Sequence, residues 1–234
     1  YAAPVTWSEA NSPYVLNSSV TIKDGAKLTI EPGVIVKING NHQIYVGSGS
    51  THRANLWAVG TSTKRIVFTS YHDDTEGGDT NGNGGDTAPA KGQWSRIYFD
   101  YIDNINLNRI EHCNIKYANE GIRFEDGSVT VTQCNISYNN YGIRAYGTGV
   151  SPTISNCNIT NNTNGIYLEF TSAWTSLQSN LIRDNNYGLV CSIVPTVNGN
   201  TIVNNSVWGG GESRFIPYNV CLKGDVYAGN TWYS

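Results

Sequence analysis

Carboxylate and amide side chains are concentrated in one glycine-rich segment of the chain. Asp79, Asn81 and Asn83, followed by Gly84, reproduce the first half of a calcium-binding loop, in which oxygen donors alternate and the glycine permits the turn. The bidentate Glu of such a loop is missing, because Ala90 stands in its place. Neighbouring oxygens would have to complete the site, and the alternative is a solvated acidic loop. The predicted calcium ligands are Asp73, Asp74, Asp79, Asn81, Asn83 and Asp86.

A second group mixes arginine, tyrosine and carboxylate at a regular interval. Arg123, Arg144 and Tyr167 follow one another at steps of 21 and 23 residues, and two positions after each of them stand Glu125, Tyr146 and Glu169. A row of this kind on a flat surface suits the hydroxyls and rings of a sugar, and it equally describes a salt-bridged face in contact with solvent. The predicted glycan-binding residues are Tyr98, Arg123, Arg144, Tyr146, Tyr167 and Glu169.

The second group lies within a repeat that must position it, whereas the first lies in a long polar excursion from about Tyr71 to Gln93. One position is occupied in turn by Cys113, Cys134, Cys157, Asn180 and Asn200, at steps of 21, 23, 23 and 20 residues. A Gly-Ile or Gly-Leu pair keeps step with it, starting at residues 121, 142, 165 and 188. Short segments with alternating apolar residues between corners predict strands with one buried face, and stacked repeats of this size enclose a shared core. We expect an all-β, right-handed parallel β-helix of roughly 8–9 coils, each of about 21–25 residues.

The corners and the cysteines complete this prediction. Asn and Gly are expected at the bends, because both tolerate the left-handed backbone conformation. Cys113, Cys134 and Cys157 should point inward as small apolar side chains. They form a line rather than converging on one point, which argues against a metal site. The chain has 5 cysteines, so they cannot all pair within it.

Three segments of the first half carry a family resemblance: 25–34 (GAKLTIEPGV), 56–61 (LWAVGT) and 66–70 (IVFTS). They resemble the opening of bacterial and archaeal surface proteins with right-handed β-helix repeats, and the later coils resemble the NosD-like and pectate-lyase-like superfamily. The resemblance implies one β-helix domain over residues 1–234. Within it we expect an N-terminal cap at 1–19, a long acidic loop at 71–93 and an irregular last coil at 208–234.

The same resemblance raises the question of catalysis. Pectate-lyase-like enzymes combine calcium on the helix face with an arginine or lysine base, and glycosidases need two carboxylates at a defined separation. An enzyme would have to use Arg123, Arg144, Glu125 and Asp126. No acidic calcium cluster is recognisable on the coils, and the four histidines are dispersed. The sequence therefore favours a protein without catalytic activity.

Composition narrows the partners and the location. The net charge is −3 without a basic stripe, which argues against nucleic acid, and the chain lacks an apolar run long enough to span a membrane. The start Tyr1-Ala2-Ala3-Pro4, the absence of Met and the abundance of Asn, Gly, Ser and Thr favour a secreted protein. We expect an extracellular structural or adhesion protein that self-associates through the ends of its solenoid into filaments. The alternative is a polysaccharide lyase, a glycoside hydrolase or a glycan-binding module. Ice binding would need a regular array of outward-facing threonines, whereas this sequence has only scattered ones such as Thr130 and Thr132.

Overall fold

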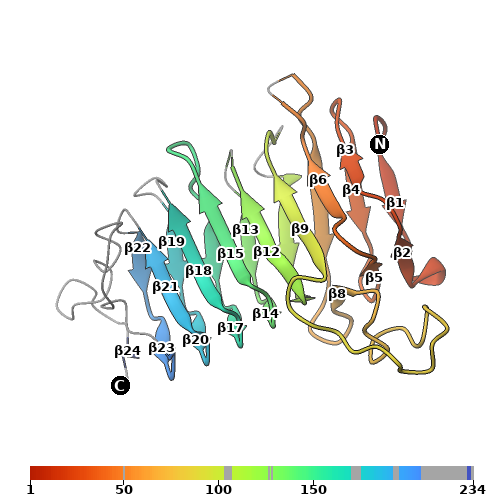
Figure 1. The fold of residues 1–234 in the computed structure, drawn as a ribbon. Helices are drawn as coiled ribbons and strands as arrows, with labels where there is room; N and C mark the ends of the chain where they lie inside the picture. Colours follow the sequence, from red (N-terminus) through yellow and green to blue (C-terminus); the bar gives the residue numbers. More distant parts are fainter. Residues whose placement is uncertain are drawn as a thin grey trace.

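The computed structural model describes residues 1–49, 51–102, 107–125, 127, 129–169, 175–191, 195–206 and 231–232. These residues form strands and turns with one short 3-10 turn, η1 (Glu9–Asn11). Each coil contributes one strand to each of three parallel sheets, and the coils stack along a single axis from the N-terminal strands to β22 (Figure 1). The predicted parallel β-helix is confirmed, and the eight strands of sheet A correspond to the expected number of coils.

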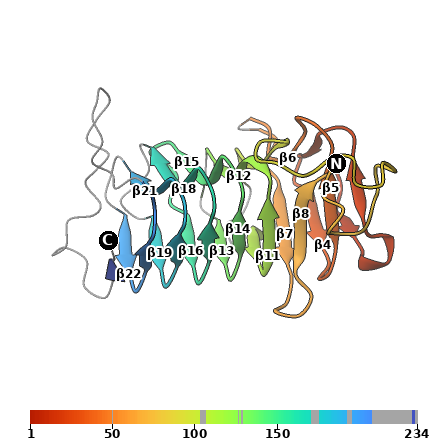
Figure 2. The ribbon, with the colours of Figure 1, turned by 60° about the horizontal axis from the view of Figure 1, so that its bottom comes forward.

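Three sheets wrap the core, and all their pairs are parallel (Figure 2). Sheet A contains β1 (Val5–Trp7), β4 (Lys27–Ile30), β7 (Asn55–Val59), β10 (Arg109–Glu111), β13 (Thr130–Thr132), β16 (Thr153–Ser155), β19 (Ser176–Gln178) and β22 (Thr196–Asn198). Sheet B contains β2 (Tyr14–Leu16), β5 (Ile35–Ile38), β8 (Ile66–Ser70), β11 (Cys113–Lys116), β14 (Asn135–Ser137), β17 (Asn158–Thr160), β20 (Leu181–Arg183), β23 (Thr201–Val203) and β24 (Thr231–Trp232). Sheet C contains β3 (Val20–Ile22), β6 (Gln43–Val46), β9 (Trp94–Phe99), β12 (Ala118–Phe124), β15 (Tyr141–Tyr146), β18 (Asn164–Glu169) and β21 (Tyr187–Cys191).

The corner between sheets A and B holds the cysteine column. Cys113, Cys134 and Cys157 are buried, as the repeat predicts, and all three are free thiols. Each thiol donates to backbone carbonyls; Sγ of Cys134, for example, lies 3.2 Å from the carbonyl oxygen of Thr132. Burial raises the pKa of the Cys134 thiol well above its ordinary value. These thiols therefore act as neutral hydrogen-bond donors inside the core.

Asparagine has two roles at the corners: Asn156, Asn161 and Asn204 adopt the left-handed conformation, as predicted, and other asparagines stack in the core. Bulky residues such as Tyr117 and Tyr138 occupy left-handed corner positions, with φ of 67° and 57°, so the prediction that Asn and Gly fill these positions is wrong there. The buried asparagines come one residue later and stack. Nδ2 of Asn139 lies 3.0 Å from Oδ1 of Asn162, whose own Nδ2 lies 3.1 Å from Oδ1 of Asn185. The asparagines satisfy the buried polar groups of the bend from rung to rung.

The recurring glycine of sheet C is required by close packing. A Cβ on Gly121 or Gly142 would lie 2.6 Å from the carbonyl oxygen of the glycine in the next rung, and one on Gly165 would lie 2.5 Å away. None of these residues has a left-handed φ. A side chain at this position would therefore force neighbouring rungs apart.

The predicted subdivisions fall at recognisable places in the fold. Residues 1–19 contain β1, η1 and β2, and the two strands pair with β4 and β5 of the next rung. Residues 71–93 connect β8 to β9 as a long excursion (Figure 1). Of the predicted irregular last coil, 208–234, only residues 231–232 are described, and β24 pairs with β23. Self-association through the solenoid ends remains a prediction.

Candidate binding face on sheet C

Strand register brings the predicted arginine and tyrosine residues into one column on the outer face of sheet C. Tyr98 is paired with Arg123, Arg123 with Arg144, and Arg144 with Tyr167. Tyr45 of β6 precedes Tyr98 in the column. Because the strands are parallel and in register, the column runs along the helix axis with a spacing of about 4.8 Å between rungs.

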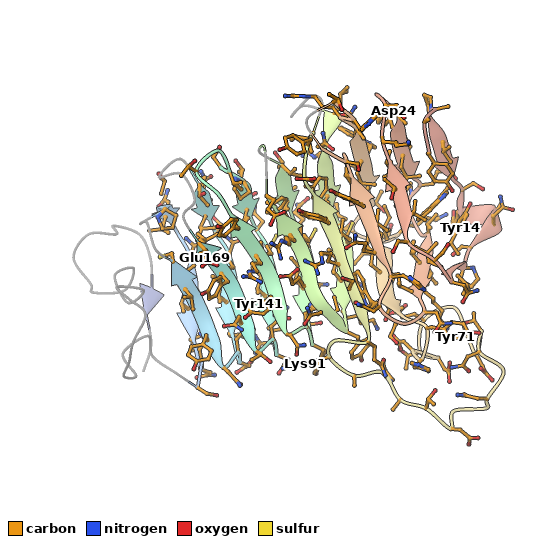
Figure 3. All side chains as sticks on the ribbon, turned by 45° about the horizontal axis from the view of Figure 1, so that its top comes forward. Tyr14, Asp24, Tyr71, Lys91, Tyr141 and Glu169 are labelled. Atoms are coloured by element: carbon orange, nitrogen blue, oxygen red, sulfur yellow. The ribbon has the colours of Figure 1, made fainter. Side chains whose placement is uncertain are left out.

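The second predicted column lies two residues further along the strands. Tyr146 is paired with Glu169, and the Tyr146 side chain is well exposed. Glu125 directly follows β12, and its backbone N–H bonds to the carbonyl of Phe99 at 2.9 Å. Asp126 lies outside the described residues. Figure 3 shows Tyr141 and Glu169 on this side of the molecule.

Glu120, which the sequence analysis did not select, is the centre of the face. Its side chain is 2% exposed and contacts three guanidinium groups. Arg96 is the first of these partners. Nη1 of Arg123 lies 3.2 Å and Nη1 of Arg144 lies 2.8 Å from Oε1 of the same carboxylate. A buried carboxylate must be paired, and here three rungs supply the cations.

Two further carboxylates complete this network. Arg123 also contacts Glu125, and Nη2 of Arg144 lies 3.4 Å from Oε2 of Glu169. Burial alone would lower the pKa of the Arg144 guanidinium, but its hydrogen bond to Glu120 raises it above the ordinary value. The network of Arg96, Arg123, Arg144, Glu120, Glu125 and Glu169 is called the guanidinium network below.

Tyrosine rings hold the guanidinium groups from the sides. The rings of Tyr45 and Tyr98 stack with centroids 4.7 Å apart, and the Arg123 guanidinium lies 5.6 Å from the Tyr98 centroid. Arg144 lies 5.2 Å from the centroid of Tyr141 and 5.6 Å from that of Tyr167. These cation–π contacts fix the arginines in place, so the face is preorganised. It presents guanidinium N–H groups, carboxylate oxygens and phenol groups to solvent.

Catalysis on this face would need an acid, a base or a metal site among these side chains. A lyase base must lose its proton: the hydrogen bond to Glu120 raises the pKa of Arg144, which opposes this, whereas burial lowers the pKa of Arg96. A glycosidase acid must hold a proton, whereas Glu120, Glu125 and Glu169 each contact at least one arginine. Among the described residues there is also no group of three or more His, Cys, Asp or Glu side chains arranged to hold a metal ion.

The acidic loop lies against sheet B through two lysines. Asp73 is fully buried, 2.9 Å from Nζ of Lys116 and 2.6 Å from the Thr69 hydroxyl. Burial alone would raise the pKa of Asp73, but hydrogen bonds from Thr69, Thr75 and Lys116 hold it below its ordinary value. Lys37, also fully buried, donates to the carbonyl of Gly78. Protein cations thus neutralise part of the charge that the sequence analysis assigned to calcium.

Asp79, Asn81 and Asn83 bond within the loop, whereas Oδ1 of Asp74 is buried without a hydrogen-bond partner. The Asp79 carboxylate accepts from the backbone N–H groups of Gly82 and Gly84, at 2.7 and 2.8 Å. The hydrogen bond from Gly84 is the main reason that the Asp79 pKa lies below its ordinary value. Nδ2 of Asn83 donates to the Thr87 hydroxyl at 2.7 Å, and Oδ1 of Asn81 accepts from the backbone of Asn83. Calcium binding by Asp73, Asp74, Asp79, Asn81, Asn83 and Asp86 stays a prediction.

Comparison with known families agrees with this architecture. The model described as a right-handed β-helix region matches residues 90–220, which is more than half of the chain. The chain belongs to the right-handed β-helix family. A pectate-lyase-like β-helix domain model matches residues 1–85 of this β-helix protein. The predicted resemblance to right-handed β-helix and pectate-lyase-like proteins is confirmed, although the pectate-lyase-like match falls on the opening of the chain and not on the later coils. No curated protein and no solved structure matches it. In the described part of the chain, no helix has the length and apolarity needed to cross a membrane.

Proposed function

We propose that this β-helix protein is an extracellular adhesion protein that binds a polysaccharide on the outer face of sheet C without cleaving it. The observation that carries the proposal is the in-register column of Tyr98, Arg123, Arg144 and Tyr167 around the buried carboxylate of Glu120. Preorganised polar groups beside aromatic rings are the usual means of recognising sugars. The extracellular location rests on composition alone.

The geometry favours an extended chain over a single sugar. The column crosses three rung intervals between Tyr98 and Tyr167, or about 14 Å. Its polar groups recur with every rung, and the spacing of about 4.8 Å between rungs is close to the length of one sugar unit in an extended polysaccharide. A chain lying along the axis would therefore contact several rungs at once, and affinity should rise steeply with the number of sugar units.

A binding measurement with matched tyrosine variants tests the proposal. Tyr146 is 41% exposed on the face, and Tyr138 is 46% exposed at the corner between sheets B and C. Affinity electrophoresis of the protein through gels containing soluble polysaccharides should show that a bound polysaccharide slows its migration. We expect Tyr146→Ala to weaken this retardation several-fold and Tyr138→Ala to leave it unchanged. Equal effects of the two substitutions, or no retardation by any polysaccharide, would contradict the proposal.

A second measurement separates binding from cleavage. Polysaccharides that retard the protein are incubated with it, and the products are assayed for new reducing ends and for the absorbance of unsaturated sugars. We expect neither signal. Product formation that disappears in Arg123→Ala or Arg144→Ala would establish the lyase or glycosidase alternative instead.

A further inference from the structure

The arginines of the face have no positive charge left for a ligand. Arg96, Arg123 and Arg144 contribute three positive charges, and Glu120, Glu125 and Glu169 contribute three negative ones, so the guanidinium network is neutral (3 − 3 = 0). Every arginine in it contacts at least one of these carboxylates. The next carboxylate on the face, Asp100, adds a negative charge and accepts from the Tyr45 hydroxyl at 2.5 Å.

An acidic glycan would have to compete with these internal pairs. Uronate and sulfate groups are typically bound by a guanidinium that offers two parallel N–H bonds. Nη1 of Arg144 is engaged with Glu120 and its Nη2 with Glu169. Each nitrogen keeps a second N–H that a sugar hydroxyl can use. A uronate or sulfate that drew the guanidinium toward itself would weaken its ion pairs with Glu120 and Glu169, and Glu120 is too buried for water to replace the lost contact. The network therefore disfavours a polyanion.

Few charged side chains surround the network. Between residues 127 and 182 the only charged side chains are Arg144 and Glu169, both members of the network. On sheet A of the same rungs the paired outward residues are hydroxylic: Thr130, Thr153 and Ser176. Lys91 also reaches these rungs, with its Nζ 3.5 Å from the Thr163 hydroxyl. Asp100 offsets its charge, so the charges named here sum to zero and do not attract a charged polymer over a distance.

From these contacts we infer that the polysaccharide bound on sheet C is a neutral one, recognised through its hydroxyl groups. This inference rests on the proposed function and adds the substrate class. Hydroxyls both donate and accept, so they match a lattice of guanidinium N–H groups, carboxylate oxygens and phenols without displacing any ion pair. Because no net charge is neutralised, binding should be insensitive to salt.

The test compares neutral and acidic polymers at two salt concentrations. The probes are soluble mixed-linkage β-glucan and galactomannan as neutral polymers, and polygalacturonate and chondroitin sulfate as acidic ones. We expect retardation by a neutral polymer that changes less than about two-fold between low and high salt, and no retardation by either acidic polymer. Retardation by an acidic polymer that salt abolishes would overturn the inference and leave the proposed function standing. Retardation by no polymer would overturn both.

A charge variant makes the test independent of the choice of neutral polymer. Glu169→Gln removes one carboxylate partner from Arg144. The matched control is Glu111→Gln on sheet A, which removes the carboxylate partner of Arg109. The side chains of Glu169 and Glu111 are similarly buried, at 20% and 19% exposure. We expect Glu169→Gln to gain salt-sensitive retardation by polygalacturonate and Glu111→Gln to gain none. If the two variants behave alike while both remain folded by circular dichroism, ion pairing on this face does not set the specificity.

Discussion

The carboxylate of Glu120 accepts a hydrogen bond from Nη1 of Arg144 in the next rung at 2.8 Å, although the residues are 24 positions apart. The contact exists because β12 and β15 are paired in parallel. It joins the sequence repeat to the chemistry of the face, since the same carboxylate also contacts Arg96 and Arg123.

Glu120→Ala is expected to destabilise the protein by about 3 kcal/mol, because breaking a buried ion pair leaves uncompensated charge. Urea unfolding followed by circular dichroism measures the loss. Glu9→Ala is the control: Glu9 pairs with Lys64 at 2.7 Å, but both side chains are about half exposed, so its loss should stay below about 1 kcal/mol. Equal losses for the two variants would show that the network is not a stabilising centre.

The period of the repeat was sufficient to predict the column but not its centre. Arg123 and Arg144 follow the recurring Gly-Ile pair, and simple alternation places both outward. The same alternation counted backward from Ile122 turns Glu120 inward. The register shift between Glu120 and Ile122 reverses that side chain. The position of Glu120 directly before the repeated glycine could have indicated that alternation breaks there, because a carboxylate pointing into the core would have no partner.

The loop shows a second limit of sequence reasoning. Asp73 and Lys116 are 43 positions apart, and nothing in the repeat period relates them. Lys37 stands in a strand where alternation leaves it facing outward, yet it is buried and donates to the loop backbone at Gly78. Contacts made by an irregular insertion depend on where it folds back, which local pattern does not specify.

Gly142→Ala is expected to destabilise the protein by about 3 kcal/mol, since the new methyl group would meet the carbonyl oxygen of Gly165 and the rungs would have to separate. Gly25→Ala is the matched control. There the added Cβ meets nothing within 4 Å, and the cost is the left-handed backbone alone, about 1 kcal/mol. Thermal unfolding compares the two variants. A smaller loss for Gly142→Ala than for Gly25→Ala would contradict the packing explanation.

Cys157→Asn is expected to stabilise the protein by about 1 kcal/mol. The backbone N–H of Cys157 already donates to Oδ1 of Asn180 at 3.0 Å, as the backbone of Asn180 does to Asn200. An asparagine here would add a side-chain bond to the same oxygen and extend the stack by one rung. Cys157→Ala should instead be destabilising, because it removes the thiol donor and leaves a small void. The midpoints of urea denaturation of the two variants test this prediction. A lower midpoint for Cys157→Asn than for Cys157→Ala would refute it.

Acid is expected to release the first part of the 71–93 loop from sheet B. The pKa of Asp73 is held below its ordinary value, so the unfolded state binds the proton more tightly than the folded state. The stabilisation is therefore fully present above the unfolded value of about 3.9 and is lost as the pH falls through the lower folded value. Hydrogen exchange of the loop amides, corrected for intrinsic rates, should show weaker protection at pH 2 than at pH 6. In Asp73→Asn the bond to Lys116 loses its charge at every pH, so protection should already be weak at pH 6 and change little on acidification. Wild-type protection that persists unchanged at pH 2 would mean that Lys37 and the loop backbone, rather than the Asp73–Lys116 pair, hold the loop in place.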